Sequence, residues 1–457
     1  MTKADVLDIA KRARLAAVSL ASVTPKQKSA ALDRIRQTLS ERRQEIFNAN
    51  KLDQTAAKEQ VDAGKLSASL YKRLDITNKD KFESILTGIS DVERLPDPTN
   101  KCTLATKLDD GLELYRVTVP VGVLLTIFEA RPEVVVNISC LALKSGNAVI
   151  LKGGKEATRT NAVLASCIQD ALASLGVNSG VPSDAVQIVE TREHIDVLLD
   201  LDRYIDLVVP RGSGSMVKYI MNHTRIPVLG HADGLCAVYI DKDADDKKAA
   251  KVLLDSKTNY TAACNSAETL LVHEDVVKDK DRLAFIVSPL LENKVVLKCD
   301  SFVIGVMKEV FGSQYPQQLE AATDEDFDTE FLDLIMAVKA VPNVHEAVAH
   351  INEHGSKHTD CIVTENKEAR DEFLTRVDAA GVYVNASTRF ADGFRYGFGA
   401  EVGVSTNKTH ARGPVGLEGL VIYKYKCYGD GHAAGDYGSE KRSFKHESID
   451  VANVNQV

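Results

Sequence analysis

The residues around Cys264 are of types that could leave its thiol accessible for reaction. Cys264 lies in Asn259–Glu268, with the sequence NYTAACNSAE, and the apolar run Thr269–Val272 follows directly. Small and amide neighbours leave a thiol accessible, and thiolates are strong nucleophiles in covalent catalysis. Free cysteines more often fill space in a core, so the local sequence leaves a structural role for Cys264 open.

A basic turn that contains glycine is a second candidate site. The predicted strand at residues 148–151 ends in KGGKEATR, where the chain turns into a helix. Glycines let a phosphate approach the backbone, and a helix N-terminus supplies N–H donors for it. The candidate phosphate ligands are Lys152, Gly153, Gly154, Lys155 and Arg159. Their three cations favour NADP over NAD, although an ordinary basic turn is the alternative.

Two weaker motifs follow further along the chain. Residues 209–216, VPRGSGSM, offer Gly212 and Ser213 as cofactor ligands, but Val217 replaces the third glycine of the dinucleotide fingerprint, and a tight turn fits as well. The loop 389–403 is aromatic and carries Arg389 and Arg395, either of which could hold an anionic group.

A metal site is not expected from the sequence. His350, His354 and His358 recur at every fourth position, but Gly355 interrupts the helix and no acidic or cysteine partner has ligand spacing. Neither G-x-S-x-G nor a P-loop is present, which disfavours the commonest hydrolases and nucleotide triphosphatases.

Composition limits the remaining classes. The 457 residues suggest two or three domains of a soluble protein, and the net charge of −9 argues against nucleic-acid binding. Eight cysteines without a C-x-x-C motif predict neither a zinc ribbon nor a disulfide framework, and they fit a reducing compartment. Residues 1–14 lack the apolar core of a secretory signal, and the uncharged run 117–128 is too short to cross a membrane. We therefore expect a cytoplasmic protein that does not bind membranes.

The patterns that must position these residues are those of an α/β protein. Amphipathic helices fill the first hundred residues, and 101–120 predicts an exposed strand or hairpin. A similar ribbon at 419–425 could pair with it or with a partner subunit. From residue 121, apolar strands alternate with helices, which predicts parallel sheets of the kind that bind dinucleotides. The expected strands are 121–128, 148–151, 185–189, 205–209, 236–240, 270–273, 294–297, 334–338, 361–364 and 382–385, and the expected helices between them are 131–145, 155–175, 192–200, 244–255, 279–291 and 343–353. Residues 314–329 predict a polar surface insert.

Several stretches together resemble the aldehyde dehydrogenase superfamily and, within it, the gamma-glutamyl phosphate reductases, over residues 1–428. They are VPVGV at 119–123, IFEARPEV at 127–134, LKSGNAVILKGG at 143–154, ACN at 263–265 and YGFGAEVG at 396–403. The resemblance implies two α/β domains with parallel sheets and a small β-flap for oligomerisation. The cofactor-binding domain would comprise 1–100 and 121–235, the catalytic domain 236–412 and the flap 101–120 and 413–428, followed by a poorly ordered tail at 429–457.

The resemblance also implies an activity, in which NADP(H) reduces L-glutamyl 5-phosphate to glutamate 5-semialdehyde, the second step of proline biosynthesis. Cys264 would be the nucleophile that forms a thioester, with its own backbone N–H as an oxyanion donor. Lys152 and Glu330 would bind the cofactor riboses, and Arg131, Asn137, Asn265, Arg389 and Arg395 are candidates to hold the substrate. A homo-oligomer and an association with glutamate 5-kinase are further expectations.

The sequence departs from the oxidative members of this superfamily at one informative place. They carry a glutamate base in a Glu-Leu-Gly-Gly segment, and the corresponding stretch here, VLGHADG at 228–234, lacks it. A reductase must avoid hydrolysis of its thioester, so the absence fits reduction. The alternatives are another semialdehyde dehydrogenase of the superfamily and a dinucleotide-binding protein whose cysteine is only structural.

Overall fold

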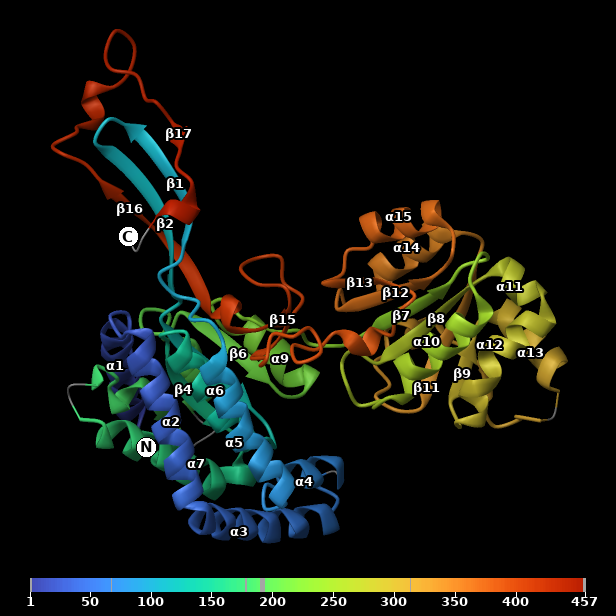
Figure 1. Cartoon of the computed structure of the whole chain (residues 1–457). Helices are drawn as coiled ribbons and strands as arrows, with labels where there is room; N and C mark the ends of the chain where they lie inside the picture. The colour runs from blue at the N-terminus through green and yellow to red at the C-terminus, as the bar shows by residue number, and fades with distance from the viewer. Residues whose placement is uncertain (1, 67, 177–178, 190–193, 313, 455–457) are drawn as a thin grey trace. The chain divides into compact units, whose positions relative to one another are not determined.

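The computed structural model describes residues 2–66, 68–176, 179–189, 194–312 and 314–454 (Figure 1). It divides the chain into two compact units. Unit 1 comprises Met1–Leu229, Phe398–Gly403 and Val415–Val457, and unit 2 comprises Gly230–Gly397 and Val404–Pro414. Each unit contains its own parallel sheet, which confirms the predicted α/β class.

The sheet of unit 1 has four parallel strands in the order β5-β4-β3-β6. Every residue of β3 and β4 is buried, as the apolar runs predict. Pro210 lies inside β6, where the sequence pattern ended the strand at Val209; an edge strand tolerates a residue without an N–H. The strands are β3 Val123–Phe128, β4 Ala148–Gly153, β5 Val186–Ile188 and β6 Leu207–Arg211, and the helices that follow them are α6 Glu133–Lys144, α7 Thr158–Ser174, α8 Ile195–Leu199 and α9 Gly214–Asn222. The predicted start of α8 at Arg192 lies outside the described residues.

The first hundred residues form helices that pack on this sheet and its helices, as predicted. Thr2 and Thr24 each form a capping box, with Asp5 and Gln27, and Pro25 occupies the first turn of α2. The apolar faces of α1 and α2 are buried, and α7 packs against α2 and α3. The helices are α1 Lys3–Leu20, α2 Pro25–Glu41, α3 Arg43–Asp62, α4 Ala68–Leu74 and α5 Lys79–Arg94.

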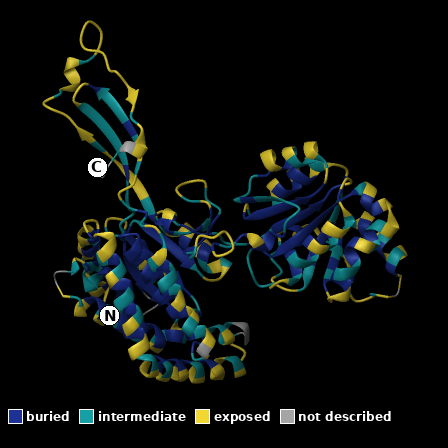
Figure 2. Cartoon of the chain, in the orientation of Figure 1, coloured by how far each residue is buried: buried dark blue, intermediate teal, exposed yellow. Residues whose placement is uncertain are grey.

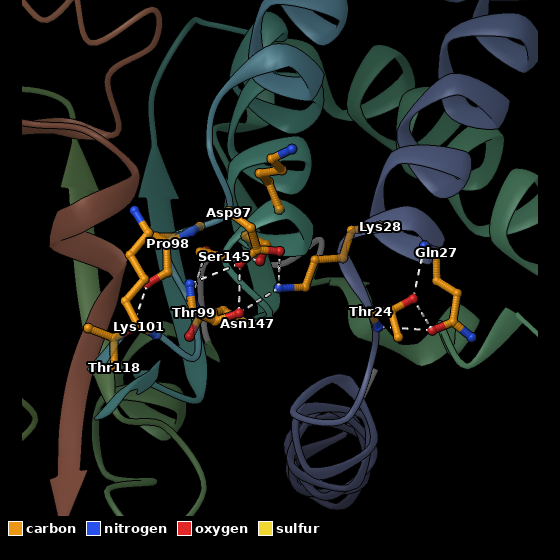
Figure 3. A network of polar contacts seen from close by, with 12 residues as sticks. Thr24, Gln27, Lys28, Asp97, Pro98, Thr99, Lys101, Thr118, Ser145 and Asn147 are labelled. Atoms are coloured by element: carbon orange, nitrogen blue, oxygen red, sulfur yellow. Dashed lines mark hydrogen bonds and ion pairs between the residues drawn. The ribbon is translucent and has the colours of Figure 1, made fainter. Parts of the chain in front are cut away.

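The two exposed ribbons pair with each other inside one chain. β1 Cys102–Asp109 and β2 Leu112–Pro120 form the predicted hairpin, and β16 Val421–Tyr428 pairs with β2 along its whole length, antiparallel. At the base of this sheet the buried Lys28 donates to Asp97 at 2.9 Å and to Thr99 at 3.1 Å (Figure 3). Asn147 donates to Ser145 and to the Leu420 carbonyl, both at 2.8 Å. These polar contacts attach the ribbons to the helices of unit 1.

The tail after Gly429 has more structure than its polar composition predicts. β17, Glu447–Ser448, pairs with β1 and completes a four-stranded sheet, β16-β2-β1-β17. Charged contacts hold the segment, because Arg442 lies 2.6 Å from the buried Asp109 and Tyr437 donates to the same carboxylate at 3.0 Å. The stacked rings of Tyr437 and Phe444 add an aromatic contact.

Unit 2 is built on seven parallel strands in the order β10-β9-β11-β8-β7-β12-β13. The strands β7, β8 and β12 are buried on both faces (Figure 2). Asp or Asn caps α10, α12, α13, α14 and α15. The strands are β7 Cys236–Ile240, β8 Ala267–His273, β9 Val296–Cys299, β10 Leu319–Ala321, β11 Ile335–Val341, β12 Thr359–Val363 and β13 Gly381–Val384. The helices are α10 Asp246–Thr258, α11 Glu274–Lys278, α12 Lys280–Glu292, α13 Ser301–Phe311, α14 Val344–His354 and α15 Lys367–Arg376.

Three features of unit 2 differ from the sequence pattern. The helices α13 and α15 were not expected, and the insert at 314–329 contains β10 and buries Asp326 and Phe327. Two further short strands, β14 Gly403–Ser405 and β15 Gly413–Val415, pair with each other. Among the described residues, no helix is long and apolar enough to cross a membrane.

Candidate functional site

Cys264 lies at the amino-terminal edge of the seven-stranded sheet. Its loop connects the end of α10 to the start of β8, between Thr258 and Ala267. β8 lies between β11 and β7, and β12 lies on the other side of β7 (Figure 1). Because all these strands are parallel, the segments that enter β7, β8 and β12 converge at one edge.

The loop that carries Cys264 is held by its own turns and by the segment after β13. Tyr260 has a φ of 82°, a strained value for a residue with a side chain, and its carbonyl accepts from the Ala263 N–H at 3.2 Å. The Arg389 Nε donates to the Asn259 carbonyl at 2.7 Å. Asn265 donates from Nδ2 to the Ala391 carbonyl at 2.9 Å, and its own carbonyl accepts from the Thr388 hydroxyl at 2.7 Å. A rigid frame therefore fixes the position of the thiol.

Gly234 approaches the backbone of Cys264 more closely than any other residue type could. A Cβ atom on Gly234 would lie 2.0 Å from the Cys264 carbonyl oxygen and 2.5 Å from its Cα. The Gly234 N–H donates to Glu330 Oε1 at 2.9 Å, and Cys236 Sγ donates to the Cys264 carbonyl at 3.4 Å. In the described part of the chain, the Cys264 N–H donates to no backbone carbonyl. That amide is consequently available as an oxyanion donor.

Exposure separates Cys264 from most of the other thiols. It is half-buried, whereas Cys140, Cys167, Cys236, Cys299 and Cys361 are buried. Burial raises the pKa of Cys140 and of Cys361 to about 12, which keeps these thiols protonated and inert. Cys102 is half-buried and Cys427 is exposed, and both lie on the strands of the β-flap.

A buried ion pair lies beneath the cysteine loop. Lys257 of α10 and Glu268 of β8 approach to 2.6 Å, and both are fully buried. Burial raises the pKa of Glu268 to about 7 and lowers the pKa of Lys257, while the contact between them opposes both shifts. Glu268 Oε1 also accepts from the Leu332 N–H at 3.2 Å. The pair thus connects the segments that precede and follow Cys264.

The three histidines considered as a metal site separate in the structure. His350 and His354 lie one turn apart on α14, with tilted rings whose centroids are 4.3 Å apart, and Gly355 ends that helix. His358 instead lies just before β12, where its ring meets His231 edge to face at 4.8 Å. His231, Cys264 and His358 offer donor atoms that all lie within 4.8 Å of one another.

The basic turn lies at the carboxyl-terminal edge of the other sheet, after β4. Lys152 is buried and its ammonium donates to the Gly153 carbonyl, while Lys155 and Arg159 are exposed. Arg159 lies 3.4 Å from Asp53 of α3, which is buried. The same carboxylate accepts from the Thr160 N–H at 2.8 Å and so caps the start of α7.

Two further carboxylates bind backbone N–H groups at this edge. Glu156 accepts from the Ala130 N–H at 2.5 Å, and Glu129 accepts from the Ser213 N–H at 2.9 Å. A Cβ on Gly154 would lie 2.0 Å from Glu156, and a Cβ on Gly212 would lie 2.6 Å from Glu129. In this structure the glycines of both turns therefore make room for the chain's own carboxylates, in positions suited to an anion.

The remaining candidates occupy several places. Asn137 lines a cavity of about 260 Å³ between α5 and α6 in unit 1, and Arg131 is half-buried after β3. Arg389 is buried, which lowers its pKa, and its guanidinium lies 5.9 Å from the ring of Tyr260. Arg395 is exposed and donates to the Arg389 carbonyl. Glu330 lies in unit 2, where it accepts from the Gly234 N–H beside the cysteine loop.

Sequence reasoning did not identify three residues of the cysteine site. Gly234 and His231 occur in the VLGHADG stretch, whose recognisable feature is a missing glutamate, and His358 is the last of three histidines at every fourth position. A glycine just before a buried strand is the signal that indicates a close backbone approach at Gly234. No local signal pairs His231 with His358, because the sheet order brings them together.

Comparison with known proteins gives a consistent result. The family model described as "Aldehyde dehydrogenase family" matches residues 1–284. A probable gamma-glutamyl phosphate reductase from Schizosaccharomyces pombe is 51% identical over 449 residues and covers 98% of both chains. The gamma-glutamyl phosphate reductase of Saccharomyces cerevisiae is 48% identical over 458 residues, again with 98% of both chains.

A solved structure agrees with these sequence matches. The crystal structure of gamma-glutamyl phosphate reductase from Thermotoga maritima superimposes with a TM-score of 0.86 and 37% identity, over 93% of this chain and 99% of that chain. The likeness therefore covers both the sequence and the fold of the chain. The chain belongs to the aldehyde dehydrogenase family and, within it, to the gamma-glutamyl phosphate reductases.

Proposed function

We propose that this chain catalyses the NADPH-dependent reduction of L-glutamyl 5-phosphate to L-glutamate 5-semialdehyde and phosphate, the second step of proline biosynthesis. The observation that carries the proposal is the setting of Cys264, a half-buried thiol on a clamped loop. Among the residues that the structure describes, the Cys264 N–H donates to no backbone carbonyl. The names of the relatives that match over 98% of the chain supply the substrate.

The chemistry assigned to Cys264 follows from the substrate. Its thiolate attacks the acyl carbon, the bond from that carbon to the phosphate oxygen breaks, and phosphate leaves with the electron pair. The thioester on Cys264 is the result. During attack the carbonyl oxygen becomes an oxyanion, to which the Cys264 N–H can donate. Collapse of the later hemithioacetal returns the thiolate and releases the aldehyde.

NADPH, when bound, supplies the hydride that reduces the thioester. We propose that unit 1 holds it at the carboxyl edge of its sheet, where Lys152, Lys155 and Arg159 surround a turn with two glycines. These cations fit a phosphate-rich cofactor, and those on the surface fit the additional phosphate of NADP. Glu330, beside the Cys264 loop, fits a ribose hydroxyl as an acceptor.

Water must be kept from reacting with the thioester. In oxidative relatives a glutamate activates that water, and the stretch 228–234 that corresponds to its segment carries no glutamate. His231 and Gly234 of this stretch lie beside Cys264 instead. This arrangement favours transfer of hydride over hydrolysis.

The β-flap is proposed as an oligomerisation surface. β16 is an edge strand of its sheet, and Tyr423, Tyr425 and Tyr428 on it are half exposed or more. An uncovered edge strand with aromatic side chains suits pairing with a second copy. Association with glutamate 5-kinase and a cytoplasmic location remain predictions, the latter supported by eight free cysteines.

The reaction is best tested in reverse, because the acyl phosphate is unstable. The purified protein is mixed with glutamate 5-semialdehyde, phosphate and NADP, and the formation of NADPH is followed by its absorbance. We expect turnover only when phosphate is present, and none with Cys264→Ala. Cys102→Ala, which removes another half-buried thiol, is the matched control and should keep wild-type activity. Turnover by Cys264→Ala near the wild-type rate, or turnover without phosphate, would contradict the proposal.

A further inference from the structure

Two histidines that the proposed reaction does not use lie beside Cys264. His231 precedes β7, Cys264 precedes β8 and His358 precedes β12, so three chain segments deliver one side chain each. Their donor atoms all lie within 4.8 Å of one another. Two imidazoles and a thiolate are the ligands that zinc and cadmium prefer in proteins.

The Nε2 atom of His358 is in a position to bind a ligand. His358 is 1% exposed, and its Nε2 is a buried atom without a hydrogen-bond partner among the described residues. Its Nδ1 lies 2.9 Å from the Thr359 hydroxyl, which holds the ring in place. A buried imidazole nitrogen normally has a hydrogen-bond partner, so this nitrogen, beside a thiol, is suited to coordinate a ligand.

His231 shows the second feature of a metal-binding histidine. Its Nδ1 lies 2.9 Å from the Val404 carbonyl, which can only accept, so Nδ1 carries the proton. The lone pair of the neutral ring is then on Nε2. Histidine ligands of zinc usually donate their other N–H to a carbonyl or carboxylate in this way, because the contact orients the ring.

We propose that His231, Cys264 and His358 form a binding site for a thiophilic divalent cation such as Zn²⁺ or Cd²⁺. Binding releases the thiol proton of Cys264 to solvent and leaves a fourth coordination position open to water. Donor atoms around tetrahedral zinc are roughly 3.5 Å apart, as bond lengths of about 2.0–2.3 Å require. The donor atoms, which lie within 4.8 Å of one another, would therefore have to approach by about 1.3 Å per pair at most.

Metal binding would switch the enzyme off reversibly, because a thiolate bound to zinc cannot attack the substrate. This consequence rests on the proposed role of Cys264 as the nucleophile, whereas binding itself does not. The two claims can thus fail separately. A chain that binds cadmium but whose Cys264→Ala variant stays active would refute the proposed reaction and leave the metal site intact.

The binding test uses the full-length chain and Cd²⁺ alone. Coordination by a thiolate gives an ultraviolet charge-transfer band, which we expect to saturate at one Cd²⁺ per chain. In Cys264→Ser that band should be absent, whereas Cys427→Ser, which removes an exposed thiol, should leave it unchanged. A band of equal intensity in Cys264→Ser would overturn the proposal.

Histidine variants then show whether the metal is bound by all three side chains or by the Cys264 thiol alone. His231→Gln and His358→Gln should each weaken Cd²⁺ binding roughly tenfold or more. His354→Gln is the matched control, because it removes a neighbouring histidine outside the trio and should not change affinity. Zn²⁺ should also protect Cys264 from iodoacetamide in the wild type, reversibly with a chelator, but not in His231→Gln. Unchanged affinity in both histidine variants would show that the thiol binds metal without them and would overturn the site.

Discussion

The two candidate sites lie at opposite edges of their sheets. The basic turn follows β4 at the carboxyl ends of the parallel strands, where helices begin and backbone N–H groups point outward. Cys264 precedes β8 at the amino ends, where helices finish. This difference decides the chemistry of each site. The carboxyl edge suits anions, whereas a site at the amino edge must consist of side chains and closely packed backbone.

The two edges also differ in how they are held. At the cysteine site the frame is buried: Lys257 pairs with Glu268, Asn265 is anchored, and Gly234 touches the Cys264 backbone. At the basic turn the cations Lys155 and Arg159 are exposed, and Glu129 and Glu156 occupy N–H groups that a bound anion could take over. A covalent step needs fixed geometry, whereas binding of a phosphate tolerates adjustment. Substitutions at the cysteine site should therefore lower stability or activity more than substitutions at the basic turn.

Breaking the buried ion pair should have the largest effect. Lys257→Met leaves Glu268 buried without its partner, and the free energy of unfolding should fall by about 3–5 kcal/mol, measured by urea denaturation. The double variant Lys257→Met/Glu268→Leu removes both charges and should recover most of that loss. A single variant that loses less than about 1 kcal/mol would mean that the frame beneath Cys264 does not depend on this pair.

Gly234→Ala tests the close approach to Cys264, the proposed nucleophile. The added Cβ would lie 2.0 Å from the Cys264 carbonyl oxygen, so the loop must move, and kcat should fall by roughly 100-fold. Gly305→Ala is the control in the same unit, because its Cβ meets nothing within 4 Å. That change should stabilise α13 by about 0.5–1 kcal/mol and leave kcat unchanged. Equal activity of the two variants would show that Gly234 does not position Cys264.

A buried carboxyl near the same edge gives a pH-dependent prediction. Burial raises the pKa of Asp360 in β12 to about 7, although its Oδ1 accepts from the Ala237 N–H at 2.8 Å. An acid whose pKa is raised on folding binds its proton more tightly in the folded state, so its contribution to stability declines as pH rises from about 4 to 7.

Asp360→Asn removes that ionisation and should stabilise the chain at pH 8 by roughly 1–3 kcal/mol relative to wild type. Near pH 4 the two proteins should differ little from this cause. Urea denaturation at several pH values measures the difference between the two curves. A constant difference across that range would show that Asp360 titrates in the folded protein as it does in water.

Sequence reasoning predicted the frame better than the contacts. β7 was expected at 236–240, where it is found, because a buried apolar run bounded by polar residues has a clear pattern. The helix α15 was not predicted, because it has no apolar periodicity: among the described residues, Phe373 is its one buried side chain. Cys264 and the basic turn were recognisable from residue types. The partners Gly234, His231 and His358 were not, because which strands become neighbours in a parallel sheet is decided by packing over the whole unit.

At the exposed edge, the smallest effect should come from Arg159. Its side chain is 59% exposed and its contact with Asp53 is 3.4 Å long, so Arg159→Ala should change the free energy of unfolding by less than about 1 kcal/mol. If it binds the additional phosphate of NADP, the KM for NADP should rise by roughly 3- to 10-fold while the KM for NAD stays the same. Lys58→Ala removes one exposed charge from α3, the helix that carries Asp53, and controls for net charge. An equal rise of both KM values would show that Arg159 supports the turn without binding that phosphate, and the proposed preference for NADP would then have to rest on Lys152 and Lys155.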